Sequence, residues 1–258
     1  DLTTGTNNVA IGNNALENVT IARYNTALGQ EAMGGITTNQ VDSCVAIGLQ
    51  AMKGTSNTTS GASRSIAIGR NALSNVTSGN QNTAVGYYAG NAIASEGSNT
   101  LVGYETGKVL TGTGNTMMGV GAGIASVDVN NTVLIGYAAN NAGNMTDAAS
   151  GTIAIGYLAG YAITSGAENI AIGYQCMDAV DDGAENIAIG YQAMSGETSG
   201  AQSIAIGSEA LKVANTTGAG TVGNIMIGHN SGIAITTGGR NTVIGAWSMQ
   251  SNQTGYYN

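Results

Sequence analysis

One short motif recurs along the sequence and limits the folds open to this chain. The ten residues GAENIAIGYQ occur at 166–175 and again at 183–192, and the triplet AIG or a close variant recurs throughout. Aligned on its glycine, the motif occurs 14 times, most often 17 residues apart. A catalytic site would not recur 14 times, but the coils of a stacked repeat fold do. The anchor glycines are Gly12, Gly29, Gly48, Gly69, Gly86, Gly103, Gly119, Gly136, Gly156, Gly173, Gly190, Gly207, Gly228 and Gly245.

The residues before each anchor glycine have the character of a short β-strand. The residue one before the glycine is aliphatic in every repeat, and the residue three before it is always β-branched. Such side chains favour strands. The residue between them is Ala in nine repeats and Leu, Met or Val in the other five. Because both faces of this strand are apolar, we expect both to be covered.

Alternation along the strand predicts which residues share a face. In the first GAENIAIGYQ, we expect Ile170 and Ile172 to point into the coil and Ala171 to point toward a partner chain. An exposed apolar stripe usually marks an interface. The anchor glycine suits a bend at the strand end. The small residue three positions later fits a tight corner, and Asn169 and its equivalents would stack into a polar ladder.

Composition argues against helical repeats. The chain has 41 glycines in 258 residues, and an interior helical Gly costs about 0.8–1 kcal/mol relative to Ala. The hydrophobic spacing is 2 and not 3.6. We therefore predict an all-β fold, a parallel β-solenoid of about 14 coils with a dominant 17-residue repeat, forming a single elongated domain over residues 1–258.

The charge balance and hydropathy weigh against two classes of partner, nucleic acid and the membrane interior. Seven Lys and Arg face fifteen Asp and Glu, for a net charge of −8, which weighs against nucleic acid because that partner needs a basic surface. No apolar run is long enough for a membrane helix, so we expect no direct membrane insertion.

Cys44 and Cys176 lie seven coils apart, so we expect both to be free. Since Asp1 is not Met and repeats approach both termini, we expect a segment of a longer protein.

The repeat also carries a family resemblance. The stretches NVAIGNNAL, SIAIGRNAL, NTAVGYYAG and NIAIGYQAM resemble the head repeats of YadA-like trimeric autotransporter adhesins, and they are similar to repeats of bacteriophage tail fibres. TSG and TTG linkers such as Thr77–Gly79 and Thr237–Gly238 strengthen the likeness. The adhesin repeat is typically shorter than 17 residues, which favours the phage-fibre relatives.

The resemblance implies a left-handed β-roll assembled as a parallel homotrimer. It further implies an extracellular, non-enzymatic structural or adhesive fibre segment, on a phage virion tail or a bacterial cell surface, with a host-cell glycan or protein as receptor. No HExxH, paired CxxC or P-loop motif is present, so no cofactor is expected. The alternatives are a carbohydrate-binding module and an ice-binding solenoid. An ice-binding solenoid needs a flat, regular array of Thr side chains. Here Thr fills the β-branched position in only five of 14 repeats, which argues against ice binding.

Tyrosines after the anchor glycine are the candidate ligand contacts. In a solenoid they stack into a partial stripe that could bind sugar rings, but we favour the interpretation that they pack between chains or against their neighbours. His229, the only histidine, occupies the same position and is interpreted as a substitute for Tyr. The tyrosines are Tyr87, Tyr104, Tyr137, Tyr157, Tyr174 and Tyr191.

Two other features are weaker candidates. Asp178, Asp181 and Asp182 cluster in one linker with Glu185. They could hold Ca²⁺ through carboxylate oxygens, but we interpret them as a solvated acidic turn. Four linkers are longer than the rest and could carry ligand contacts: 34–43, 53–64, 140–151 and 212–223.

Overall fold

The structure, a computed structural model, describes residues 5–36, 41–54, 62–213, 223–251 and 254–255. Its internal contacts divide the chain into two compact units, Asp1–Asp128 and Val129–Asn258, here named unit 1 and unit 2. The predicted fold class is confirmed, because both units are parallel β-solenoid with essentially no helix and a spacing of about 17 residues. The described chain makes about 13 turns in all, against about 14 predicted coils.

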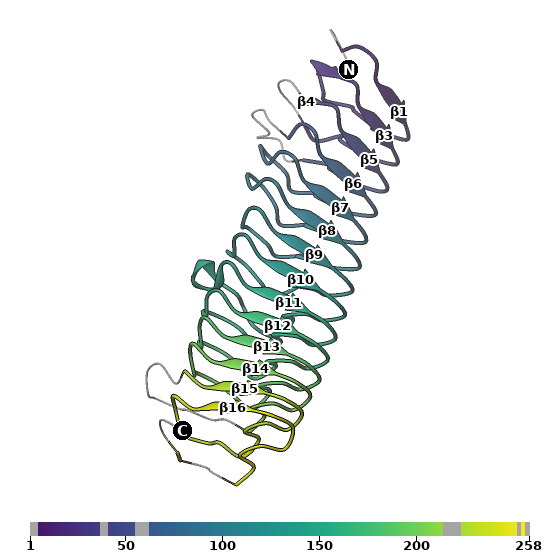
Figure 1. The fold of residues 1–258 in the computed structure, drawn as a ribbon. Coiled ribbons are helices and arrows are strands. Elements are labelled where there is room, and N and C mark those ends of the chain that lie inside the picture. The colour runs from purple at the N-terminus through teal and green to yellow at the C-terminus, as the bar shows by residue number, and fades with distance from the viewer. Residues whose placement is uncertain (1–4, 37–40, 55–61, 214–222, 252–253, 256–258) are drawn as a thin grey trace. The chain divides into compact units, whose positions relative to one another are not determined.

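Unit 1 is a stack of three-residue parallel strands joined in the order β1-β3-β5-β6-β7-β8-β9 (Figure 1). A two-stranded parallel sheet of β2 and β4 lies in the same unit. The strands are β1 (Val9–Ile11), β2 (Ala22–Arg23), β3 (Thr26–Leu28), β4 (Val41–Asp42), β5 (Val45–Ile47), β6 (Ile66–Ile68), β7 (Thr83–Val85), β8 (Thr100–Val102) and β9 (Thr116–Met118).

Unit 2 repeats the same architecture, with parallel strands in sequence order from β10 to β16. Each strand pairs with the equivalent residues of the next, as in Ile170↔Ile187. Within the described residues no helix is long and apolar enough to cross a bilayer. The elements are β10 (Val133–Ile135), the 3-10 turn η1 (Asp147–Ala149), β11 (Ile153–Ile155), β12 (Ile170–Ile172), β13 (Ile187–Ile189), β14 (Ile204–Ile206), β15 (Ile225–Ile227) and β16 (Thr242–Ile244).

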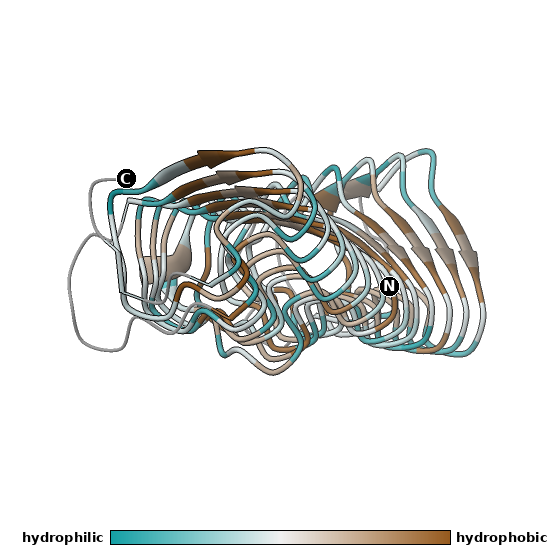
Figure 2. Ribbon diagram, turned by 60° about the horizontal axis from the view of Figure 1, so that its bottom comes forward, coloured by the Kyte–Doolittle hydropathy of each residue, from teal (hydrophilic) through white to brown (hydrophobic). Residues whose placement is uncertain are grey.

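The predicted orientation of the strand side chains is wrong. Ala171 and Ala188 are fully buried, whereas Ile170 and Ile172 are only partly buried and Ile189 is 36% exposed. The alanine column therefore points into the coil and the flanking aliphatic columns point out (Figure 2 shows the strands in hydrophobic brown). The reason is space. The inner residue must share a thin coil interior with the large side chains of the opposite wall.

Those opposite-wall side chains form most of the core. The residue four after the anchor glycine is commonly Leu or Met, as in Leu73 and Met177, and the residue seven after it is often Ile, as in Ile163. In three coils where the first of these is Gly, at Gly107, Gly123 and Gly232, the inward strand residue is larger than Ala. Leu101 stands where nine coils have Ala, and a Cβ on Gly107 of the same coil would lie 3.1 Å from its Cδ2, while one on Gly90 of the preceding coil would lie 2.7 Å from its Cδ1. Dense interiors require such volume compensation.

Backbone conformation explains which residues the corners accept. In each described repeat the positions five before, two after and four after the anchor glycine have φ near +55° or are glycine, as at Glu185 (59°), Gln192 (49°) and Met194 (56°). This left-handed region excludes β-branched side chains most strongly. None of these columns contains Val, Ile or Thr; those residues occupy the strand columns instead.

A polar ladder closes the start of each strand, as the sequence predicts. In unit 2, the amide nitrogen of Asn186 donates to Oδ1 of Asn169 at 3.0 Å, and that of Ser203 donates to Oδ1 of Asn186 at 3.0 Å. Nδ2 of Asn186 donates to the carbonyl oxygen of Gly200 at 2.7 Å. Each buried amide thus bonds the next coil and its linker at once, which satisfies groups that burial would otherwise make costly.

Candidate functional site

Four tyrosine rings form a continuous ladder on unit 2. Each ring belongs to the residue after an anchor glycine, so the coil spacing sets the ring spacing. Ring centroids are 5.5 Å apart for Tyr137–Tyr157, 4.9 Å for Tyr157–Tyr174 and 5.5 Å for Tyr174–Tyr191, with interplanar angles of 12–15°. All four side chains are exposed. The structure therefore brings these four predicted site residues together.

Unit 1 carries a shorter version of the ladder. Tyr87 and Tyr104 stack at 5.1 Å, and Tyr88 meets the Tyr87 ring edge-on at 4.5 Å. Two cations lie over these rings, Arg70 over Tyr87 at 5.8 Å and Lys108 over Tyr88 at 5.2 Å. Such contacts are modestly favourable at exposed sites, so they help to hold the unit 1 rings in place.

The stacking limits what the ladder can bind. Within the unit 2 ladder, each internal ring has a neighbouring ring against both faces, so edges and hydroxyl groups point to solvent. A sugar that stacks on an aromatic ring needs an uncovered face. The internal rings Tyr157 and Tyr174 therefore fit the packing interpretation. Tyr191 differs, because Ser208 occupies the ladder position one coil further on.

A second exposed surface is an apolar stripe along the strands, which the sequence analysis assigned to the alanine column instead of the isoleucine columns. The outward columns of β10–β16 consist of isoleucine apart from Val133 and Thr242, and they run along the whole outer face of the unit 2 sheet. In unit 1 the outward column three before the anchor glycine is more polar, with Thr at β3, β7, β8 and β9. We name the two outward columns of unit 2 the outer aliphatic face. The sequence pattern that could have predicted this face is the large aliphatic residue on either side of each small Ala in the strands.

The acidic linker does not assemble into a metal site. Asp181 accepts the Thr164 hydroxyl through Oδ1, and its carbonyl oxygen accepts the Thr164 amide at 2.9 Å. Asp178 is partly buried, and burial raises the pKa of its carboxyl. Asp182 is exposed. Among the described residues no group of three or more His, Cys, Asp and Glu side chains could hold a metal ion.

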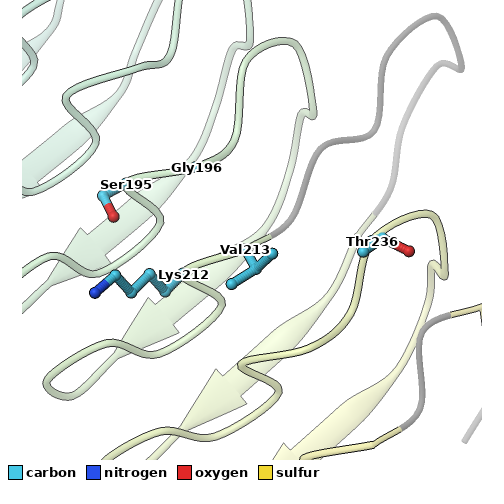
Figure 3. Close-up of a pocket in the computed structure, with 5 residues that line it drawn as sticks. All are labelled: Ser195, Gly196, Lys212, Val213 and Thr236. Carbon is cyan, nitrogen blue, oxygen red and sulfur yellow. The ribbon is translucent and has the colours of Figure 1, made fainter.

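The long linkers give little further chemistry. Residues 37–40, 55–61 and 214–222, within three of them, lie outside the described residues. The linker 140–151 contains η1. A shallow groove of about 510 Å³ is lined by side chains from three successive coils that do not converge (Figure 3). Its residues are Ser195, Gly196, Lys212, Val213 and Thr236.

Both cysteines are free, as predicted, and the structure shows that both are buried. Cys44 donates through Sγ to the carbonyl oxygen of Ala62 at 3.2 Å, and Cys176 donates to that of Ala188 at 3.1 Å. Burial raises the pKa of the Cys44 thiol to about 11 and that of Cys176 to about 12. Since the thiolate is the reactive form, both side chains act as packing residues.

Comparison of the chain with family models, with curated proteins and with solved structures yields no match. The site must therefore be judged by its own geometry. Two surfaces stand out: the tyrosine ladder and the outer aliphatic face. Neither arranges a nucleophile, an acid–base pair or a metal ligand set.

Proposed function

We propose that this chain is a structural and adhesive fibre segment without enzymatic activity. It would assemble as a parallel homotrimer and present receptor-binding surfaces outside the cell, on a phage tail or a bacterial surface. The observation that carries the proposal is the outer aliphatic face, an extended apolar surface that a single chain leaves partly exposed.

The physical support begins with exposure. Along unit 2, Ile153, Ile170, Ile187 and Ile204 repeat on one side of the face at every coil, and a second column of isoleucines runs beside them. Soluble monomers rarely expose large contiguous apolar patches, which usually mark an interface. Burying such area stabilises an assembly by about 25 cal/mol per Å².

The repeat itself favours a second copy of this chain as the partner. Successive rungs present the same pair of isoleucines at the strand spacing, about 4.8 Å. Another copy in parallel orientation has the same period, so each rung can meet an equivalent rung along the whole face. An unrelated partner would need to reproduce that spacing.

The sequence resemblance supports the finer features. The YadA-like and phage-fibre repeats that the motif resembles are left-handed β-rolls that assemble as trimers. This resemblance is the basis for the proposed handedness of the solenoid and for the proposed trimer. Multivalent display would then convert weak receptor contacts into avidity. The scarcity of positive charge fits a protein or glycan receptor better than a nucleic acid.

Light scattering coupled to size-exclusion chromatography tests the proposal. At micromolar concentration we expect a mass three times the 25.6 kDa of the chain. Chemical cross-linking of the same sample should give a trimer band with no ladder of larger species. A monomer under these conditions would refute the assembly, and with it the fibre function.

A further inference from the structure

The tyrosine ladder of unit 2 places four phenol groups side by side in adjacent coils. Consecutive ring centroids are 4.9–5.5 Å apart, and the ring planes differ by only 12–15°. The four residues are 41–57% exposed, so each phenol can be reached from solvent. The ladder therefore combines close contact between phenols with access for a reagent.

Backbone hydrogen bonds keep neighbouring tyrosines in register. The amide of Gln175 donates to the carbonyl oxygen of Tyr157 at 2.8 Å, and the amide of Gln192 donates to that of Tyr174 at 2.9 Å. The glutamine side chains are joined as well, since Nε2 of Gln192 donates to Oε1 of Gln175 at 3.0 Å. Each ring therefore keeps the same neighbour as long as the coils remain paired.

Phenols held in this way can be joined by one-electron oxidation. A peroxidase with hydrogen peroxide removes one electron from each of two tyrosines, and each phenol then releases its proton to leave a neutral phenoxyl radical. The two radicals pair their electrons in a carbon–carbon bond between positions ortho to the oxygens. Each bonded carbon then loses its hydrogen as a proton, and each oxygen takes one up. The pair has lost two hydrogen atoms, and the peroxide has become two water molecules.

The ladder favours coupling between neighbours over coupling between molecules. Exposed side chains change rotamer in picoseconds to nanoseconds, so two stacked rings can slip into the offset that the new bond requires. A group tethered this close has an effective concentration far above that of other molecules at micromolar protein. The neighbouring ring is therefore the first partner that a radical on this ladder meets.

A bond between neighbouring rings would lock one coil to the next. Strand pairing and the polar ladder join the coils without a covalent bond, and both cysteines are free. Tyr157 and Tyr174 are 17 positions apart, so a link between them closes a loop of the chain. Closing such a loop lowers the entropy of the unfolded chain, which makes the stack harder to unwind.

We infer that the tyrosine ladder of unit 2 is a modification site, where peroxidase-type oxidation joins adjacent coils as dityrosine. The inference requires contact within one chain only, so it does not depend on the proposed trimer. The stacked pair Tyr87–Tyr104 of unit 1, at 5.1 Å, should couple in the same way. The links expected in unit 2 are Tyr137–Tyr157, Tyr157–Tyr174 and Tyr174–Tyr191.

Oxidation of the whole chain with a peroxidase and hydrogen peroxide, followed by peptide mass spectrometry, tests the site. Cleavage after Asp and Glu residues places the four ladder tyrosines on four different peptides. Wild-type protein should yield linked peptides from neighbouring coils, each pair lighter by two hydrogen atoms. On denaturing electrophoresis the product should keep the mass of one chain, and dilution of the protein should not change the yield. The urea midpoint of the oxidised protein should rise.

Two phenylalanine variants provide matched controls. Tyr174→Phe keeps a ring in the ladder but removes its hydroxyl, so both links to position 174 should be lost while Tyr137–Tyr157 remains. Tyr161 shares a peptide with Tyr157 but lies outside the ladder column. Tyr161→Phe should therefore leave every link unchanged.

N-acetyltyrosine in a parallel reaction shows that the oxidant is active. Absence of links between neighbouring coils at a dose that dimerises N-acetyltyrosine would overturn the inference. Links that join separate chains instead of adjacent coils, or that survive Tyr174→Phe at position 174, would overturn it too. A trimer without neighbour links refutes the modification site alone, and a monomer that forms them refutes the assembly alone.

Discussion

A β-carbon placed on Gly190 would lie 2.6 Å from the carbonyl oxygen of Gly207 in the next coil. The same conflict recurs along the anchor column, for example between Gly48 and Gly69 at 2.8 Å. Gly190 also has φ of +137°, a conformation open essentially to glycine alone. The repeated glycine is therefore a steric requirement of stacking coils at the strand spacing.

Replacing Gly190 with alanine should be severely destabilising. The new methyl group meets backbone that cannot move without separating two coils, and the backbone conformation is strained. We expect a loss of about 3 kcal/mol in the free energy of unfolding, measured by urea denaturation followed by circular dichroism.

Gly223→Ala is the matched control for that experiment. Gly223 also has a positive φ, +58°, but a Cβ there would meet nothing within 4 Å. The free energy of unfolding of Gly223→Ala should fall by about 1 kcal/mol, the usual penalty for a residue with a side chain in the left-handed region. Equal losses for the two substitutions would show that contact between glycines in adjacent coils does not set the anchor column.

Asn186→Ala tests the polar ladder. The substitution leaves the amide of Ser203 and the carbonyl oxygen of Gly200 without their side-chain partner, and buried unsatisfied groups cost about 1–3 kcal/mol each. We expect a loss of about 3 kcal/mol by the same denaturation assay. Gln202→Ala, which removes an exposed side-chain hydrogen bond, should change stability by less than about 0.5 kcal/mol; a comparable loss there would argue against the ladder.

The ring ladder predicts unequal effects for two tyrosines. Tyr174 stacks on both neighbours, whereas Tyr191 stacks on Tyr174 alone. Each pair is worth about 0.5–1.5 kcal/mol, so Tyr174→Ala should cost about twice as much stability as Tyr191→Ala. Thermal melts followed by circular dichroism measure the difference, and identical melting temperatures would mean that the rings do not stabilise each other.

Cysteine titration gives a pH dependence of known sign. The folded pKa of Cys176, about 12, lies above the ordinary value of 9.0, so the unfolded chain releases this proton first. The contribution of the Cys176 thiol to the free energy of unfolding is therefore fully present below pH 9, and it is lost as the pH rises toward 12. A thiol-reactive dye at pH 8 should label neither cysteine in native protein and both in urea. Rapid native labelling would contradict their burial.

Some of this structure was readable from the sequence and some was not. The 14 anchor glycines and the stiff residues around them predicted a parallel β-solenoid, and Asn169 and Asn186 predicted the polar ladder. Both follow from local chemistry that each coil repeats. The aromatic stripe was also visible, because residues at equal repeat positions must stack.

The inward face was mispredicted because local pattern does not reveal the size of the enclosed space. Ile172 is the more hydrophobic residue, but the interior beside it already holds side chains such as Met177 from the opposite wall. Only the small Ala171 fits there. Similarly, the left-handed backbone at Met177 and Met194 runs against the usual preference of such side chains, so tertiary geometry alone could disclose it.

The direct test of the outer aliphatic face compares two neighbouring substitutions. Ile189→Asp places a charge on that face, and Ala188→Asp places one in the coil interior, where Ala188 is fully buried. Circular dichroism and light scattering are measured on both variants and on wild type at micromolar concentration. We predict a wild-type trimer, folded Ile189→Asp monomers, and loss of structure in Ala188→Asp because an unpaired buried charge is strongly unfavourable. A monomeric wild type, or an Ile189→Asp variant that remains a trimer, would contradict the assignment of this face as the interface between copies.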